Sequence, residues 1–182
     1  MLPRQNFMIY LAAYDPNWAK LFQIERQEIL AAIGQYVAKI EHIGSTSIPD
    51  LCAKPVIDIL VGVHRLADFD ELAIEKLTSQ GYEYVEKYNQ LMPERRFFQK
   101  SNQAGMRTHQ IHLVQIDGDF WHRHLLFRDY LRSHPEEAKQ YQKLKQALAL
   151  KYSDSNEYAG AKTEFCQKIH LKAQAWVNSL LS

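Results

Sequence analysis

The residues with the clearest chemical potential lie in the segment from Ile40 to Val63. It contains a run of small residues, namely Gly44, Ser45, Thr46 and Ser47. A glycine lets a ligand approach the backbone, and neighbouring hydroxyl and amide groups can donate hydrogen bonds to a phosphate. Ser47 and Asp50 also have the spacing of a capping box, which predicts a helix whose N-terminus faces the same anion. The run predicts a phosphate-binding turn, although a capped helix start without a ligand has the same pattern.

A lysine and an aspartate follow this turn. Lys54 precedes an apolar, β-branched stretch, Pro55 to Val63, that reads as a buried strand, and Asp58 lies inside that stretch. Lys54 can pair with a phosphate as a point charge. A carboxylate in an apolar strand is costly to bury without a partner, and a magnesium ion would supply one. We therefore expect Lys54 to bind ligand and Asp58 to be catalytic, the alternative for Asp58 being a structural acid paired with a buried base.

Asp58 is the only acid in its predicted strand. Two acids spaced two residues apart on a strand point to one face and share metal ions, but the residue two places after Asp58 is Leu60. The next candidate strand, residues 107–115, contains no acid and offers Gln110 and His112 on one face. We expect His112 to be the second catalytic residue. A single magnesium or manganese ion would then be bound by Asp58, His112 and His42.

Basic residues are concentrated between Lys87 and Arg132. This stretch has eight Lys and Arg residues against four acids, a local excess of +4. Such an excess is typical of a phosphate-binding surface and equally of the solvated face of an edge strand. The basic residues among apolar neighbours are the ones expected to bind ligand: Arg96, Arg107, Arg128 and, near the C-terminus, Lys162.

The string HIGSTSIPDLCAKPVIDILV resembles the signature of the GrpB family, a branch of the nucleotidyltransferase superfamily. The resemblance extends to the segments 14–18 and 127–131 and to Tyr158, Lys162 and Phe165. It implies a nucleotidyltransferase-like fold, a nucleotide or other phosphorylated ligand, and nucleotidyl transfer. A domain that resembles this chain also occurs fused to dephospho-coenzyme A kinase, which implies a protein partner or a ligand-sensing role.

Hydrophobic spacing predicts the elements that must position these residues. Helices are expected from Asp15 to Gly34, over 66–80, and after capping boxes at Ser133 and Asp154. Strands are expected over 37–43, 55–63, 82–85, 96–100 and 106–116. An N-terminal strand or arm is expected over 7–13. This order predicts an α+β fold, with a mixed β-sheet flanked by helices and a helical C-terminal portion. We expect one domain over 1–182, with a core at about 15–118 and a helical layer at about 119–182.

Composition narrows the class of protein. The 182 residues include 22 Lys and Arg against 21 Asp and Glu, a net charge of +1, which argues against a dedicated nucleic-acid or membrane binder. Two cysteines are too few for a disulfide framework and predict a cytoplasmic protein with reduced thiols. Two functions remain open: a nucleotidyltransferase, and a catalytically inactive ligand-binding or partner-supporting domain. The sequence leaves the nucleotide, the acceptor and the oligomeric state open.

Overall fold

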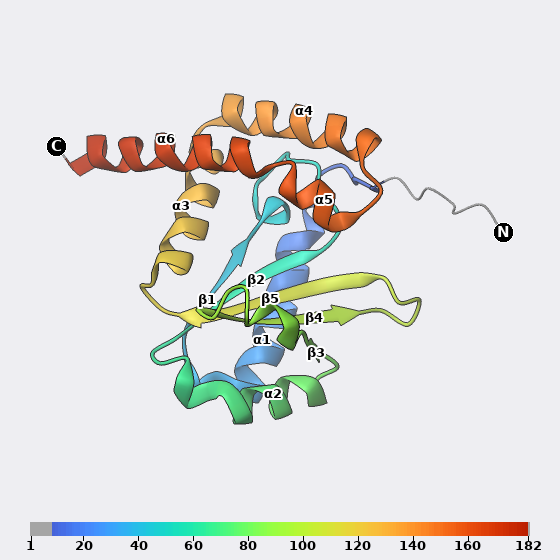
Figure 1. Cartoon of the computed structure of the whole chain (residues 1–182), viewed down its shortest axis with the longest axis vertical. Helices are drawn as coiled ribbons and strands as arrows, with labels where there is room; N and C mark the ends of the chain where they lie inside the picture. Colours follow the sequence, from blue (N-terminus) through green and yellow to red (C-terminus); the bar gives the residue numbers. More distant parts are fainter. Residues whose placement is uncertain (1–8, 182) are drawn as a thin grey trace.

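A single five-stranded sheet forms the centre of the molecule (Figure 1). The computed structural model describes residues 9–181. The strands are β1 (Val37–Ile43), β2 (Ile57–Val63), β3 (Glu83–Tyr84), β4 (Arg95–Ser101) and β5 (Arg107–Gln115), in the spatial order β1-β2-β5-β4-β3. β2 and β5 are parallel and the other neighbours are antiparallel, so the predicted mixed sheet is confirmed.

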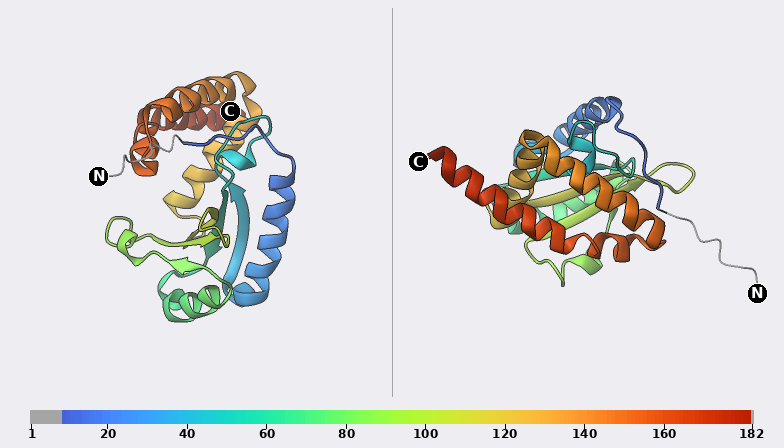
Figure 2. Two further views of the ribbon diagram at one scale, coloured as in Figure 1. Left: turned by 90° about the vertical axis from the view of Figure 1, so that its right-hand side faces the viewer. Right: turned by 90° about the horizontal axis from the view of Figure 1, so that it is seen from above.

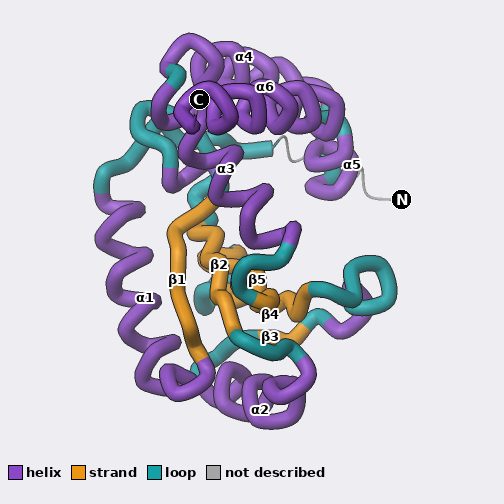
Figure 3. Tube along the Cα trace, turned by 90° about the vertical axis from the view of Figure 1, so that its left-hand side faces the viewer, coloured by secondary structure: helices purple, strands orange, loops and turns teal. Residues whose placement is uncertain are grey.

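Six α-helices surround the sheet. They are α1 (Asn17–Ile33), α2 (Asp70–Ser79), α3 (Asp119–Ser133), α4 (Pro135–Lys151), α5 (Ser155–Gly160) and α6 (Thr163–Leu181). Figure 3 shows α1 running alongside β1, with α4 and α6 lying together at the opposite end of the molecule from α2. The α+β class and the helical C-terminal portion are therefore confirmed. Within residues 9–181, no helix is long and apolar enough to span a membrane.

The alternation of β2 explains why the sheet carries helices on both faces. Ile57, Ile59 and Val61 point to one face and join the largest apolar core, to which α1 contributes Phe22 and Ile29. Burial of this face, including side chains from α2, provides the main hydrophobic stabilisation.

The opposite face of β2 packs against α3. Leu60 is fully buried there, together with Phe120 and Trp121 of α3. A Cβ atom on Gly62 would lie 2.8 Å from the Trp121 ring, so this strand glycine makes room for the helix. Leu60 is thus a core residue between β2 and α3 rather than a vacant place for a second carboxylate.

The C-terminal helices form a second layer at one end of the sheet (Figure 2). Their apolar core takes two side chains from the loop after β1, Ile48 and Leu51, and packs them against α3, α4 and α6. The loop between β1 and β2 therefore belongs to the helical layer as much as to the sheet. Distant parts of the sequence meet along it.

Two of the predicted helix starts are confirmed and two are wrong. Asp15 accepts a hydrogen bond from the Asn17 amide (2.9 Å), and Asp154 caps α5 by accepting from two amides (2.8 and 3.0 Å). The capping box at Ser133 does not form, because α4 begins with Pro135. The box at Ser47 does not form either: a short 3₁₀ helix, Ser45–Ser47, ends there, and the Ser47 hydroxyl donates to the Gly44 carbonyl (2.7 Å).

Two other predictions need adjustment. The helix expected to follow Asp154 is broken between α5 and α6, at Ala161 and Lys162. The N-terminal strand or arm predicted over 7–13 lies partly outside the described residues, and within them Ala12 pairs with Ala53 in an isolated β-bridge.

Two histidines, one buried (His42) and one half-buried (His124), pack on either side of the sheet. His42 stacks on Phe22 (ring centroids 4.8 Å apart) on the α1 side, whereas His124 stacks on Phe120 (3.9 Å) on the α3 side. Burial lowers the pKa of His42 to about 4 and the pKa of His124 to about 3, because the interior disfavours the charged ring.

We predict that the protein loses stability as the pH falls from 6.5 towards 4. The folded-state pKa values lie below the ordinary value of 6.5, so the unfolded chain takes up protons first, at a cost of up to about 1.4 kcal/mol per pH unit for each histidine. Urea midpoints at pH 7 and pH 5 measure the slope. His42→Phe should make the slope shallower, whereas His64→Asn, at an exposed position, should leave it unchanged. Equal slopes in all three proteins would contradict the prediction.

Candidate functional site

The turn after β1 is built around a close contact between Gly44 and Asp58. Gly44 has a φ of +70°, and a Cβ atom added to it would lie 2.2 Å from Asp58 Oδ2. Asp58 is the second residue of β2 and pairs with Ile43, so the two strands bring the carboxylate against the turn. Its side chain is 26% exposed, which makes it half-buried and not fully enclosed as the sequence suggested. Gly44 thus makes room for a carboxylate of this chain.

The hydroxyl groups of the turn have internal partners. Thr46 is buried, donates to the Val56 carbonyl (3.3 Å) and lies 3.0 Å from His42 Nε2. Ser47 is also buried, and its hydroxyl donates to the Gly44 carbonyl. Ser45 is half-buried and hydrogen-bonds with the Tyr141 hydroxyl of α4. Among the three hydroxyls, Ser45 is therefore the one that joins the turn to the helical layer.

A hydrogen-bonded chain holds the Asp58 carboxylate from the side of β5. The Gln110 side-chain amide is oriented so that its nitrogen donates to Asp58 Oδ1 (3.0 Å) and its oxygen accepts from Arg107 Nη1 (2.9 Å). Asp58 and Gln110 are register partners in the parallel pair of strands. The structure thus brings together Arg107 and Asp58, two of the residues that the sequence singled out.

Two predicted lysines converge on Tyr158 of α5. Lys54 Nζ lies 5.5 Å from the centre of the Tyr158 ring and Lys162 Nζ lies 4.2 Å from it. Lys54 also donates to the Ser155 hydroxyl (3.3 Å). Lys162 follows Tyr158 by four residues and lies at the break between α5 and α6.

A third lysine, Lys145 of α4, completes what we call the lysine cluster: Lys54, Lys145 and Lys162. Lys145 is only 2% exposed, donates to the Cys52 carbonyl and lies 5.3 Å from the centre of the Tyr141 ring. The sequence analysis missed it. Ala138, Tyr141, Lys145 and Ala149 are the buried residues of α4 and recur at helical spacing, so the periodicity of a buried stripe was the signal that could have revealed it.

The lysine cluster has an unusual electrostatic state. Burial, reinforced by the positive charge of Lys162, lowers the pKa of Lys145 to about 7, although Asp58 opposes the shift. Burial and the charge of Lys54 lower the pKa of Lys162 to about 8. Burial also lowers the pKa of Lys54, and Arg107 adds to the effect. Buried cations that repel one another form a site that an anion would stabilise.

His112 lies on the same face of the sheet as Asp58, because it pairs in register with Leu60. Its Nε2 atom is 3.9 Å from Asp58 Oδ1, and its Nδ1 atom is 3.1 Å from Arg95 Nη1. Arg95 was not singled out from the sequence, which favoured Arg96. The pairing of Phe97 with His112 puts Arg95 and Phe97 on the Asp58 face and turns Arg96 to the other face.

The three expected metal ligands do not come together. His42 pairs in register with Ile59 and stacks on α1, so it lies on the opposite face of the sheet from Asp58 and His112. In the described part of the chain, no group of three or more His, Cys, Asp or Glu side chains could hold a metal ion. The residues therefore do not fit the predicted single-metal site built from protein ligands.

Arg128 is a structural residue and not a ligand-binding cation. It is buried, and it donates to Glu41 Oε2 (2.7 Å), to the His42 carbonyl (3.1 Å) and to Asp129 Oδ1 (2.7 Å). These bonds tie α3 to β1 and neutralise the guanidinium. Arg128 has apolar neighbours in the sequence because it lies in the buried part of α3.

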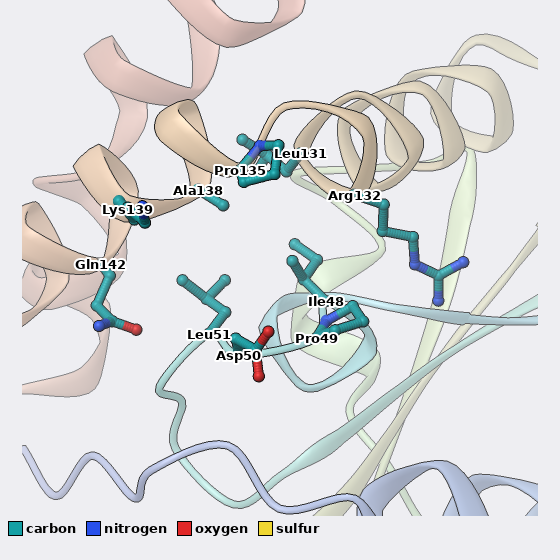
Figure 4. A pocket seen from close by; sticks show the side chains of 10 residues that line it. All are labelled: Ile48, Pro49, Asp50, Leu51, Leu131, Arg132, Pro135, Ala138, Lys139 and Gln142. Atoms are coloured by element: carbon teal, nitrogen blue, oxygen red, sulfur yellow. The ribbon is translucent and has the colours of Figure 1, made fainter.

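A pocket of about 290 Å³ lies beside the turn but contains none of the predicted site residues (Figure 4). Its walls come from the loop after β1 and from the junction of α3 and α4. Arg132 lines it and donates twice to the Ser47 carbonyl (2.9 and 2.7 Å), while Gln142 accepts from the Cys52 amide (2.9 Å). These side chains fix the loop that carries the turn and Lys54.

We predict that Gly44→Ala destabilises the protein by more than the cost of its positive φ alone. A matched control exists in Gly105, which has a φ of +75° and no atom within 4 Å of an added Cβ. Gly105→Ala should cost about 1 kcal/mol, whereas Gly44→Ala should cost at least ~2 kcal/mol because the Asp58 carboxylate must move. Chemical denaturation measures both values. Equal losses would show that the Gly44–Asp58 contact is unimportant.

Comparisons with known proteins place the chain in a family. A model of the "GrpB protein" family matches residues 8–172. The chain is 37% identical over 97% of its length to the UPF0157 protein YqkA of Bacillus subtilis, of which it spans 50%. It is 36% identical over 88% of its length to the glutamate-rich protein GrpB of Alkalihalophilus pseudofirmus, of which it spans 93%.

The fold agrees with a solved structure of the same family. The conserved protein GrpB from Enterococcus faecalis has 36% sequence identity and a TM-score of 0.82, with 92% of this chain and 99% of that chain covered. The Cid1 poly(U) polymerase gives a TM-score of 0.45 at 14% identity, a likeness too slight to carry an inference about activity. Sequence and fold agree that this chain belongs to the GrpB family.

Proposed function

We propose that the lysine cluster binds the phosphate groups of a phosphorylated small molecule. The observation that carries the proposal is the convergence of Lys54, Lys145 and Lys162 in a poorly solvated place, where the negative charge of Asp58 acts on all three amines and that of Asp154 acts on Lys54. Without a ligand, the desolvation and mutual repulsion of these amines destabilise the fold. An anion with two or more phosphate groups would offset both effects.

A nucleotide is the ligand class that we favour. Tyr158 lies under two of the lysines, and Ser45 reaches the cluster through Tyr141. Both tyrosines are buried, so their rings support the lysines from behind and do not stack on a ligand. The resemblance of the turn and Asp58 to nucleotidyltransferases points to this ligand class. Transfer of a nucleotidyl group by this chain is the stronger form of the proposal.

A second candidate function is ligand binding without catalysis. Leu60 occupies the place of the second carboxylate and is fully buried between β2 and α3, so two-metal transfer has no second acid on this strand. A dephospho-CoA kinase of Mycolicibacterium paratuberculosis is 27% identical over 94% of this chain, which spans 47% of that protein. A role beside a protein partner is therefore part of this second proposal.

Magnesium or manganese would enter this site with the ligand. Mg²⁺ is commonly bound by one or two carboxylates together with substrate phosphates. Asp58 is the carboxylate near the lysine cluster, and phosphate oxygens would complete the coordination. We therefore propose a divalent cation as an accessory to ligand binding and not as a resident cofactor. Asp58→Asn should then remove any gain in affinity that Mg²⁺ brings.

The cellular setting is also a proposal. Cys52 and Cys166 are free thiols, which supports a location in the reducing cytoplasm. A net charge of +1 gives no support to a nucleic-acid partner. A phosphorylated metabolite, free in solution, is the partner that fits these observations.

We predict that ADP binds this protein and that Lys162→Met weakens the binding at least 10-fold. Loss of a hydrogen bond to a charged group costs about 1.5–3 kcal/mol, which corresponds to roughly 10- to 100-fold in affinity. Isothermal titration with ADP, AMP and pyrophosphate, with and without Mg²⁺, measures the effect. Lys168→Met, at an exposed position of α6, is the matched control and should bind normally.

The same variant has a second expected phenotype. Lys162→Met should leave stability unchanged or raise it, because it removes a repelled, poorly solvated charge. Weaker binding together with retained stability would identify a ligand site. Absence of binding by the wild type to all three probes would refute the proposal. Binding without nucleotide turnover would favour the second candidate function.

We predict that ADP binding weakens as the pH rises from 7 to 9. Lys145 and Lys162 lose their protons across this range, with pKa values of about 7 and about 8, whereas a terminal phosphate is fully ionised above about pH 7. At pH 7.5, binding should therefore take up protons, which titrations in buffers of different ionisation enthalpy detect. A pH-independent affinity would contradict this charge assignment.

A further inference from the structure

Arg95 occupies a distinctive position beside His112. Its guanidinium carbon lies 4.8 Å from the centre of the Phe97 ring, 5.7 Å from that of Phe120 and 5.8 Å from that of Tyr88. These rings hold the guanidinium by cation–π contacts and restrict its movement. From this position Nη1 reaches His112 Nδ1 at 3.1 Å. The cation is thus aimed at one nitrogen of one histidine.

The chemistry of this contact fixes the proton of His112. A guanidinium group donates hydrogen bonds and cannot accept them. His112 Nδ1 must therefore be the acceptor and carry no proton. In the neutral ring the proton is then on Nε2, the nitrogen that faces Asp58 Oδ1 at 3.9 Å.

The ring is also held in place by its neighbours. His112 packs against Phe97 (ring centroids 5.2 Å apart) and against Phe120 (5.8 Å). His124, whose ring centre is 6.2 Å away, donates from Nδ1 to the Phe120 carbonyl (2.7 Å). The orientation of the Nε2–H group is therefore set by β4, β5 and α3 together.

We propose that Arg95 is a positioning residue that makes His112 a hydrogen-bond donor at the site. The proposal rests on the proposed function, because the acceptor is an oxygen of the anionic ligand bound beside Asp58. In this state Nε2 has no free lone pair, so His112 neither binds a metal ion nor removes a proton through that atom. Its role differs from the catalytic and metal-binding role that the sequence suggested. The site would then contact its ligand with lysines on one side of Asp58 and with an imidazole N–H on the other.

The test is the tautomer of His112, measured by long-range ¹H–¹⁵N NMR on the whole chain without ligand. The His112 signals are assigned by their loss in His112→Gln. In the wild type at pH 8, Nε2 should have the chemical shift of a protonated nitrogen and Nδ1 that of an acceptor. In Arg95→Met the difference between the two shifts should shrink or reverse, whereas Arg95→Lys, which still donates, should retain it.

Each outcome bears on the proposal. A proton on Nδ1 in the wild type, or an unchanged tautomer in Arg95→Met, would overturn it. If Arg95→Met does not fold, Arg95→Gln replaces it, because an amide can accept as well as donate and no longer fixes the tautomer. Because these spectra need no ligand, they remain decisive even if ADP does not bind.

Addition of ADP tests the contact itself. The shift of Nε2–H should move on binding in the wild type and should not move in Lys162→Met at the same concentration. ADP binding that leaves the Nε2–H signal unmoved would overturn the donor role while leaving the proposed function intact.

Discussion

The close approach of Asp58 to Gly44 is the constraint on which the rest of the site depends. It requires a residue without a side chain at the end of β1, in a conformation that favours glycine. The chain then leaves the sheet through a short 3₁₀ turn and inserts Ile48 and Leu51 into the core of the C-terminal helices. One contact thus holds the carboxylate near the start of β2 and directs the following loop into the second layer.

The two layers meet through polar ties that leave the lysine cluster unneutralised. Arg128 joins α3 to β1 with Glu41 and Asp129, and Arg132 holds the Ser47 carbonyl. These arginines have partners, so their charges are balanced. Within the described chain, the lysine cluster has no such close ion pair: the charges of Asp58 and Asp154 act on it, and its amines are poorly solvated. Proteins tolerate such an arrangement where binding a ligand compensates for it, since burying unpaired charge is otherwise selected against.

The two sides of Asp58 differ in chemistry as well as in position. Lys54, Lys145 and Lys162 come from the loop and the helical layer and offer positive charge. His112 and Arg95 come from β5 and β4 and offer a fixed N–H direction. Charge on one side attracts an anion, and directed donation on the other orients it.

The sequence by itself determined the strands, the α+β class and the family, because alternating apolar residues and a glycine-serine turn are local signals. It also identified Asp58, Lys54, Arg107 and Lys162, which the structure brings together. Only the tertiary structure decided which face each residue occupies. The register of β4 against β5 puts Arg95 on the Asp58 face, and a shift of one residue would put Arg96 there instead. Lys145 becomes a site residue only when α4 docks against the loop that carries Cys52. Arg128 is neutralised by Glu41, which is distant in sequence, and by the adjacent Asp129. Such pairings between distant segments leave no local pattern, so spacing along the chain could not reveal them.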